Sequence, residues 1–217
     1  MVHRLQLLND PERIPFIQQK VISNFSVISG TILQAQQTTP LITAHRTLMA
    51  RWGLIPSSAR NDFQSINRLS AEASSIGYSS TYRLVVRKNR ALLPIQSYFF
   101  THQSQGKSWM NKVERKEGLC WLVPVVYDQW VNHHQQEIIS FALIHHTIRT
   151  DDRTMKLPLH LSSREAVDQW FDVSFHPKNL SQHLPTLEDY YWSTDPSEIQ
   201  MSQTPTHFAV PKNRHIA

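Results

Sequence analysis

Cysteine is almost absent from this sequence: the 217 residues include one, Cys120. One cysteine excludes an intrachain disulfide and a metal cage built from several thiolates. Because Cys120 lies between Leu119 and Trp121 in an apolar segment, we expect it to be buried and unreactive. The sequence also lacks an apolar run of the roughly 18 residues that cross a bilayer, and its start lacks the layout of a secretory signal. These absences predict a soluble, cytoplasmic protein.

Acidic residues are missing from the stretch 82–90, which contains four cations: Arg83, Arg87, Lys88 and Arg90. The whole chain carries a formal charge of +5 and has a pI of about 9.5. A dense positive segment favours contact with phosphate groups, although a solvated basic face explains the same pattern. No cofactor is predicted. The pair His133-His134 has no third ligand nearby in the sequence, so no metal site is expected there.

Apolar segments bounded by prolines and polar turns predict a β-rich core. The predicted strands cover residues 27–34 (interrupted at Ser29-Gly30), 47–54, 91–100, 108–113, 119–127 and 138–147, and a further strand starts at 41–42. Predicted helices cover about 11–24, 69–76 and the segment after Ser162, where Ser162 is the expected cap and Glu165 lies three residues on. The segment 83–90 fits either a strand or a short helix.

The chain is long enough for one complete hydrophobic core, and we expect a single domain over residues 1–175. Residues 176–217 contain several prolines and little periodicity. They are predicted to form a tail that wraps on the domain or is partly flexible. A monomer is expected.

The order of several motifs resembles the SRAP family, the SOS-response-associated peptidases that protect abasic sites in DNA. The matching motifs, in order, are Trp52–Pro56 (WGLIP), Ile66-Asn67, Tyr82-Arg83, Leu93-Pro94, Val126–Trp130, Ser140–Thr147 and Leu157–Leu161. The resemblance implies an α+β, β-rich fold with mainly antiparallel strands in a barrel-like core and flanking helices.

Family members begin with a cysteine whose thiol and α-amine close a thiazolidine on the aldehyde of an abasic site. In this chain Val2 stands in the place of that cysteine, while Phe100 and Thr154 stand where the family has a glutamate and a histidine. Of the catalytic set, Asn67 is retained. The resemblance therefore implies a degenerate site at Val2 and Asn67 that does not form the covalent crosslink, and it leaves open whether any catalysis persists.

His145 and His146 lie where the family has two threonines beside its pocket. On a strand adjacent side chains point to opposite faces, so at most one of the two faces the site. That histidine is a candidate substitute acid or base, and the alternative is a packed or surface histidine.

The resemblance also implies a partner, single-stranded or abasic DNA. The residues predicted to contact it are Arg4, Arg68, Arg83, Arg87, Lys88 and Lys156. Ser58 replaces a family tryptophan that offers an aromatic platform to a base. The alternative function is a catalytically inactive scaffold that binds another protein and has no role on DNA.

Overall fold

The computed structural model describes residues 2–8, 14, 16–17, 31–104, 107–115, 120–149, 154–172, 174–176, 179–180 and 190–194. Its elements are β1 (Val2–Leu7), β2 (Ile32–Gln34), β3 (Thr38–Ile42), β4 (Thr47–Trp52), η2 (Ser65–Asn67), β5 (Ser70–Glu72), α2 (Val85–Lys88), β6 (Arg90–Ser104), β7 (Lys107–Arg115), β8 (Trp121–Val131), β9 (Glu137–Arg149), β10 (Thr154–Pro158), α3 (Arg164–Phe171) and β11 (Tyr190–Thr194). No helix in these ranges is long and apolar enough to cross a membrane.

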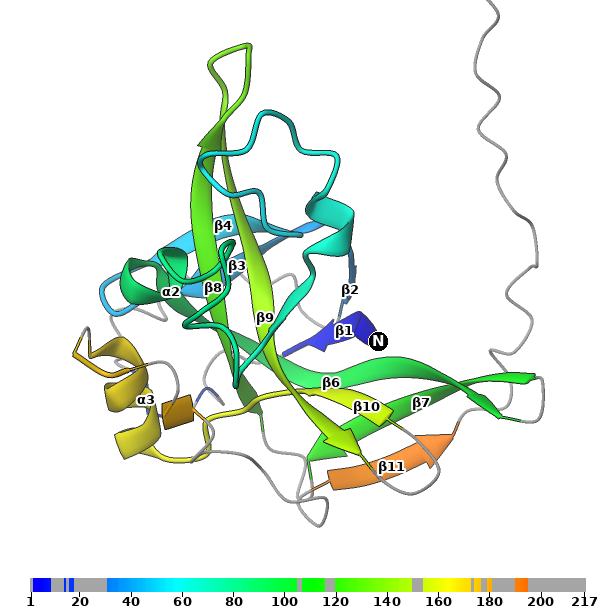
Figure 1. Cartoon of the computed structure of the whole chain (residues 1–217). Helices are drawn as coiled ribbons and strands as arrows, with labels where there is room; N and C mark the ends of the chain where they lie inside the picture. The colour runs from blue at the N-terminus through cyan, green and yellow to red at the C-terminus, as the bar shows by residue number, and fades with distance from the viewer. Residues whose placement is uncertain are drawn as a thin grey trace, which may run out of the picture.

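Five strands close into a ring in the order β3, β4, β9, β8 and β6. The β4–β9 pair is parallel, and the other four pairs are antiparallel. Figure 1 shows β8 and β9 as a long hairpin through the middle of the molecule, with α2 and α3 to one side and β6 with β7 extending to the other. The predicted α+β, β-rich fold, with mainly antiparallel strands in a barrel-like core and flanking helices, is confirmed.

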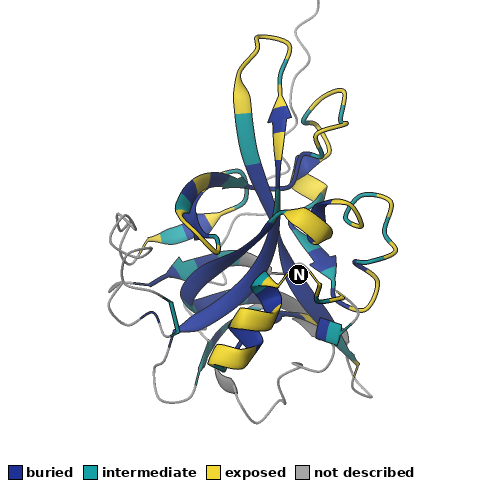
Figure 2. Ribbon diagram, turned by 90° about the vertical axis from the view of Figure 1, so that its left-hand side faces the viewer, coloured by how far each residue is buried: buried dark blue, intermediate teal, exposed yellow. Residues whose placement is uncertain are grey.

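The ring strands are buried on both faces because their side chains alternate between two hydrophobic clusters. In β8, Trp121 and Val123 pack in one cluster, whereas Leu122 and Val126 pack in the other. Successive side chains of a strand point to opposite faces of the sheet, so this alternation is expected. Figure 2 shows the resulting pattern, with buried strands at the centre and exposed residues toward the tip of the β8–β9 hairpin and on the outer face of α3.

Two ring strands continue beyond the barrel and carry the remaining elements. The second half of β6 pairs with β1 on one side and β7 on the other, and β7 in turn pairs with β11. The second half of β9 pairs with β5 in parallel and with β10 in antiparallel fashion. The amino-terminal strand, β5 and β10 are therefore held by extensions of the same barrel. β11 lies within the predicted tail, and the boundary at residue 175 stays a prediction.

Helix α3 begins one residue later than its predicted cap. The Oγ of Ser163 accepts a hydrogen bond from the backbone N–H of Ala166 at 3.2 Å, so Ser163 caps the helix and the prediction of Ser162 was wrong. The predicted apolar face is present: Ala166, Val167 and Trp170 are buried, and the Trp170 Nε1–H donates to Ala91 O at 3.0 Å.

Several other local predictions can be compared with the structure. The predicted helix at 69–76 was wrong, since residues 70–72 form β5 and turns follow. The ambiguous segment 83–90 forms the short helix α2 and the first residue of β6. The predicted helix at 11–24 lies almost entirely outside the described residues, as do residues 27–30 of the first predicted strand.

Candidate functional site

The WGLIP motif is a structural turn that fixes where the following segment starts. Trp52 is fully buried, and its Nε1–H donates to Leu69 O at 2.9 Å. Gly53 has a φ of 124°, and a Cβ at this position would lie 2.4 Å from Gln36 Nε2 and 2.8 Å from Ser65 O. Only glycine suits both this backbone conformation and this close approach. The motif therefore secures the connector, which we define as residues 57–84.

The start of the connector is held against β8 by a buried carboxylate. Asp128 Oδ2 accepts from Ser57 N at 2.7 Å, and its Oδ1 accepts from Gln129 N at 3.0 Å and from Asn89 Nδ2 at 3.5 Å. Trp130 Nε1–H donates to Ala59 O at 2.7 Å nearby. Because internal donors occupy both carboxylate oxygens, Asp128 is an anchor for the connector and not a free base.

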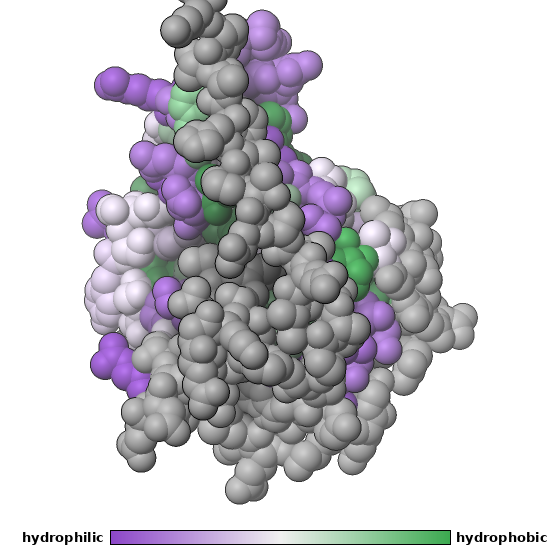
Figure 3. Space-filling view, turned by 90° about the vertical axis from the view of Figure 1, so that its right-hand side faces the viewer, coloured by the Kyte–Doolittle hydropathy of each residue, from purple (hydrophilic) through white to green (hydrophobic). Residues whose placement is uncertain are grey.

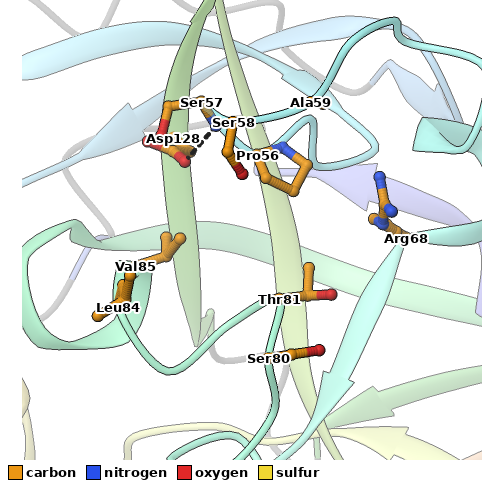
Figure 4. Close-up of a pocket in the computed structure, with 10 residues that line it drawn as sticks. All are labelled: Pro56, Ser57, Ser58, Ala59, Arg68, Ser80, Thr81, Leu84, Val85 and Asp128. Atoms are coloured by element: carbon orange, nitrogen blue, oxygen red, sulfur yellow. Dashed lines mark hydrogen bonds between the residues drawn. The ribbon is translucent and has the colours of Figure 1, made fainter.

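A cleft of about 300 Å³ opens between the two ends of the connector, α2 and β8. Figure 4 shows its ten lining residues, Pro56, Ser57, Ser58, Ala59, Arg68, Ser80, Thr81, Leu84, Val85 and Asp128. The guanidinium of Arg68 lies on one side, and the hydroxyls of Ser80 and Thr81 point to that same side. Leu84 and Val85 lie on the opposite side. The cleft thus has a cationic, hydroxyl-rich end and an apolar end.

Arg68 is oriented by its neighbours in η2 and in the connector. Its Nη2 donates to Gln64 Oε1. The positive charge of Arg68 also acts on Tyr82. Burial raises the pKa of Tyr82 to about 12, and the charge of Arg68 partly opposes this increase. The phenol therefore stays neutral beside the cation, and Arg68 keeps donors available for an anionic ligand.

The basic run divides into surface and interior residues. Arg83, Arg87 and Lys88 are exposed, on the connector and α2. Arg90 is 6% exposed and donates to the backbone carbonyls of Val86, Trp170, Asp172 and Phe175 at 2.6 to 3.0 Å. Burial lowers the pKa of Arg90, and the charge of Asp172 partly offsets this effect. Arg90 is therefore part of the folding core, whereas the other three cations are free to meet a ligand.

Large apolar side chains are also exposed on the connector. Among the described residues, the most exposed large hydrophobic side chains include Phe63 at 80%, Tyr78 at 70%, Leu84 at 65% and Ile66 at 58%. Figure 3 shows small hydrophobic patches and hydrophilic residues next to each other on the coloured part of one face. Cationic and aromatic side chains thus occur together on one segment, which is the composition of surfaces that bind single-stranded nucleic acid.

The amino-terminal strand brings two predicted site positions together. The backbone of Val2 pairs with that of Phe100 across β1 and β6. Phe100 is 3% exposed and packs in the same hydrophobic cluster as Tyr98 and Val113. Arg4 is half-buried on β1, and Thr154 begins β10, opposite Arg149. The side chains of Val2 and Thr154 lie outside the described part of the structure.

The two adjacent histidines of β9 differ in their surroundings. His145 Nε2 lies 3.2 Å from Glu72 Oε2, and the Thr147 hydroxyl donates to the same carboxylate oxygen. Burial lowers the pKa of His145 to about 4; Glu72 raises it, while Lys156, His146 and the amino terminus lower it further. Burial also lowers the pKa of His146, and Glu72 partly opposes this. His145 is therefore a neutral imidazole beside a carboxylate.

Sequence reasoning missed Glu72, which is the partner of the histidine that it singled out. The two residues are 73 positions apart in the sequence and meet because β5 pairs with β9 in the register Glu72 to His145. Asn67, by contrast, is exposed at the end of η2. Lys156 lies opposite Thr147 on β10, next to this cluster. The structure thus places Lys156 with the histidine cluster and Arg68 at the cleft.

The described residues contain neither a cluster of metal ligands nor an exposed thiol. No group of three or more His, Cys, Asp or Glu side chains in these ranges is placed to hold a metal ion. Cys120 is 3% exposed and its Sγ donates to Trp121 O at 3.5 Å, in agreement with the predicted buried thiol.

The closed five-stranded barrel and the connector, which exposes cationic and aromatic side chains, define a β-barrel domain with a candidate ligand-binding surface. The chain belongs to the SRAP family: the family model described as SOS response associated peptidase (SRAP) matches residues 17–202. No curated protein matches the sequence.

Solved structures share the fold at low sequence identity. A crystal structure of a protein from Bacteroides thetaiotaomicron has a TM-score of 0.75 and 18% identity and covers 93% of this chain and 99% of its own. A protein from Bordetella bronchiseptica has a TM-score of 0.69 and 15% identity, over 89% and 99% of the two chains. A phage-related protein from the same organism has a TM-score of 0.64 and 14% identity, over 89% and 94%.

Proposed function

We propose that this SRAP protein binds single-stranded or abasic-site DNA reversibly in the DNA-damage response, without the covalent thiazolidine step of its family. The observation that carries the proposal is the connector, where exposed aromatic side chains such as Phe63 and Tyr78 occur among the cations Arg68 and Arg83. Cations neutralise phosphates along the strand, and aromatic rings stack on bases of any sequence.

The route of the strand follows from where the cations lie. Four cations lie on the connector and α2, namely Arg68, Arg83, Arg87 and Lys88. Arg4 and Lys156 form a second group on β1 and β10, next to the amino-terminal end where the family carries out its chemistry. Strand contact with both groups would place an abasic sugar near the amino terminus.

The absence of the covalent step follows from the sulfur chemistry. A thiazolidine needs a thiol and an amine on the same residue, and residue 2 is valine. Cys120, the one cysteine in the sequence, is buried in a hydrophobic cluster and cannot supply the thiol. His145 is the candidate substitute acid or base of this degenerate site, because its Nε2 lies 3.2 Å from the carboxylate of Glu72.

Fluorescence anisotropy with a labelled single-stranded oligonucleotide tests the proposal. Arg83→Glu with Arg87→Glu should weaken binding strongly and reduce the dependence of log affinity on log salt by about 0.7 for each phosphate that the protein no longer neutralises. Arg46→Glu with Arg164→Glu is the control, because it makes the same change in net charge at exposed positions away from the connector.

Equal losses in both double variants would mean that net charge, and not this surface, governs binding. Weak binding that does not change with salt in the wild-type protein would favour the alternative, a catalytically inactive scaffold that binds another protein. Folding of each variant is checked by circular dichroism before the titration.

A further inference from the structure

The cleft between the connector and β8 has the size and polarity of a site for one nucleotide. Its volume of about 300 Å³ is far larger than a phosphate ion needs and lies at the lower end of the range for small-molecule sites. Its two ends differ chemically: Arg68 with Ser80 and Thr81 on one side, Leu84 and Val85 on the other. A ligand that matches it has an anionic end and a largely apolar end.

The cationic end of the cleft contains hydrogen-bond donors that are available to a ligand. No hydrogen bond joins the hydroxyls of Ser58, Ser80 or Thr81 to other groups in the part of the chain that the structure describes. Arg68 donates one N–H to Gln64, which fixes the guanidinium at the cleft and leaves further N–H groups for a ligand. Guanidinium and hydroxyl donors together are suited to phosphate oxygens, which only accept hydrogen bonds.

The carboxylate in the cleft does not oppose this assignment. Asp128 is 8% exposed, lies away from Arg68 in Figure 4, and accepts from Ser57 N, Gln129 N and Asn89 Nδ2. These hydrogen bonds hold the connector in place, and the carboxylate lies away from the end of the cleft where Arg68 would bind a phosphate. Beside it, Leu84 is 65% exposed although it is large and apolar, and with Pro56 it offers a surface on which a base can pack.

From these contacts we propose that the cleft binds one phosphorylated nucleotide, its phosphate held by Arg68, Ser80 and Thr81 and its base packed against Leu84 and Pro56. The nucleotide is either the 5′-phosphorylated end of a DNA strand or a free nucleoside monophosphate. The inference rests on the proposed function if the ligand is a strand end, and it does not depend on that function if the ligand is a free nucleoside monophosphate.

Isothermal titration with 2′-deoxyadenosine 5′-monophosphate and with 2′-deoxyadenosine tests the site. We expect the monophosphate to bind at least about tenfold more tightly than the nucleoside, and Arg68→Gln to remove that difference, because a charge-assisted hydrogen bond is lost. Ser80→Ala with Thr81→Ala should have a smaller effect in the same direction. Leu84→Ala should weaken both ligands, and Arg46→Gln, at an exposed position outside the cleft, should change neither.

The proposal is overturned if the monophosphate does not bind, if Arg68→Gln behaves like Arg46→Gln, or if inorganic phosphate binds as tightly as the nucleotide. Oligonucleotides with a 5′-phosphate or a 5′-hydroxyl distinguish the sources: a preference for the phosphate that the monophosphate competes away identifies a strand end, and no preference identifies the free nucleotide. Failure of the monophosphate to bind, with intact and salt-dependent oligonucleotide binding, would overturn this inference alone and leave the proposed function standing.

Discussion

The guanidinium of Arg90 lies inside the fold, where three of its nitrogens donate to four backbone carbonyls. It also lies 5.2 Å from the centre of the Trp170 ring. These bonds tie the end of α2 to α3 and the segment that follows it. The sequence does not distinguish Arg90 from Arg83, Arg87 and Lys88, because charge alone does not show which cation is buried.

Arg90→Met tests this role. Methionine fills much of the space but leaves the four carbonyls without their donor, so we expect the free energy of unfolding to fall by at least about 3 kcal/mol. Urea denaturation measures it. Arg87→Met, at an exposed position of α2, is the control and should change stability by less than about 0.5 kcal/mol. Similar values for the two variants would contradict the buried role of Arg90.

His145 makes stability depend on pH. Its pKa is about 4 in the folded protein, against about 6.5 for a histidine in an unfolded chain. Between these values the unfolded chain binds more protons, so the free energy of unfolding should decrease as the pH falls from 6.5 to 4, by up to about 3 kcal/mol from this residue. Glu72 opposes the change, while Lys156 and His146 favour it.

Urea denaturation at several pH values, compared between wild type and His145→Gln, measures this contribution. The variant should lose stability less steeply below pH 6.5, and His133→Gln, at an exposed turn position, should follow the wild-type curve. A His145→Gln curve parallel to the wild type would show that the imidazole is not held in its neutral form.

Among the site residues, the surface cations of α2 could be predicted because they stand together in sequence without acids. The buried Phe100 was also predictable, since it belongs to an apolar strand. Glu72 could not be found, because its meeting with His145 depends on parallel pairing between distant strands. The cleft could not be predicted either, because its lining residues come from four separate parts of the chain.

Among the elements, strands with long apolar character were the easiest to predict. The segments now seen as β4, β6, β8 and β9 were all identified from their apolar runs. The helix at 69–76 was wrong because its helix-forming residues are recruited as β5 to the edge of β9, and tertiary pairing overrides so weak a local preference. The predicted boundaries of the elements differ from the observed ones by a few residues, which is common because the ends of helices and strands are defined less sharply than their centres.

The cap of α3 offers a comparison between two adjacent serines. Ser163→Ala removes the Oγ that accepts from Ala166 N, and we expect a loss of about 1 kcal/mol in the free energy of unfolding. Ser162→Ala should have little effect, since Ser162 is exposed and precedes the cap. Chemical denaturation of both variants decides between them, and a larger loss for Ser162→Ala would support the cap expected from sequence.

The connector should bind bases through Phe63, whose ring is 80% exposed. Phe63→Ala removes a stacking surface but no charge, so affinity for single-stranded DNA should fall by about fivefold or more while the salt dependence stays the same. Met49→Ala, at an exposed apolar position of β4, is the control. Anisotropy titrations at two salt concentrations measure both quantities, and unchanged affinity would remove Phe63 from the interface.

At the scale of the whole molecule, the closed barrel is the frame on which the other elements are held. The ring of β3, β4, β9, β8 and β6 is buried on both faces, and the connector and the amino-terminal strand lie outside it. Relatives with identities of 14 to 18% keep this fold. The barrel architecture is therefore compatible with widely different sequences.

The most direct measurement of the central claim is the intact mass of the protein after incubation with a single-stranded oligonucleotide that contains one abasic site. The account predicts binding in a native, low-salt assay, together with the unmodified protein mass after heating in denaturant. A heat-stable conjugate of protein and oligonucleotide would contradict it, because residue 2 offers no thiol to make one.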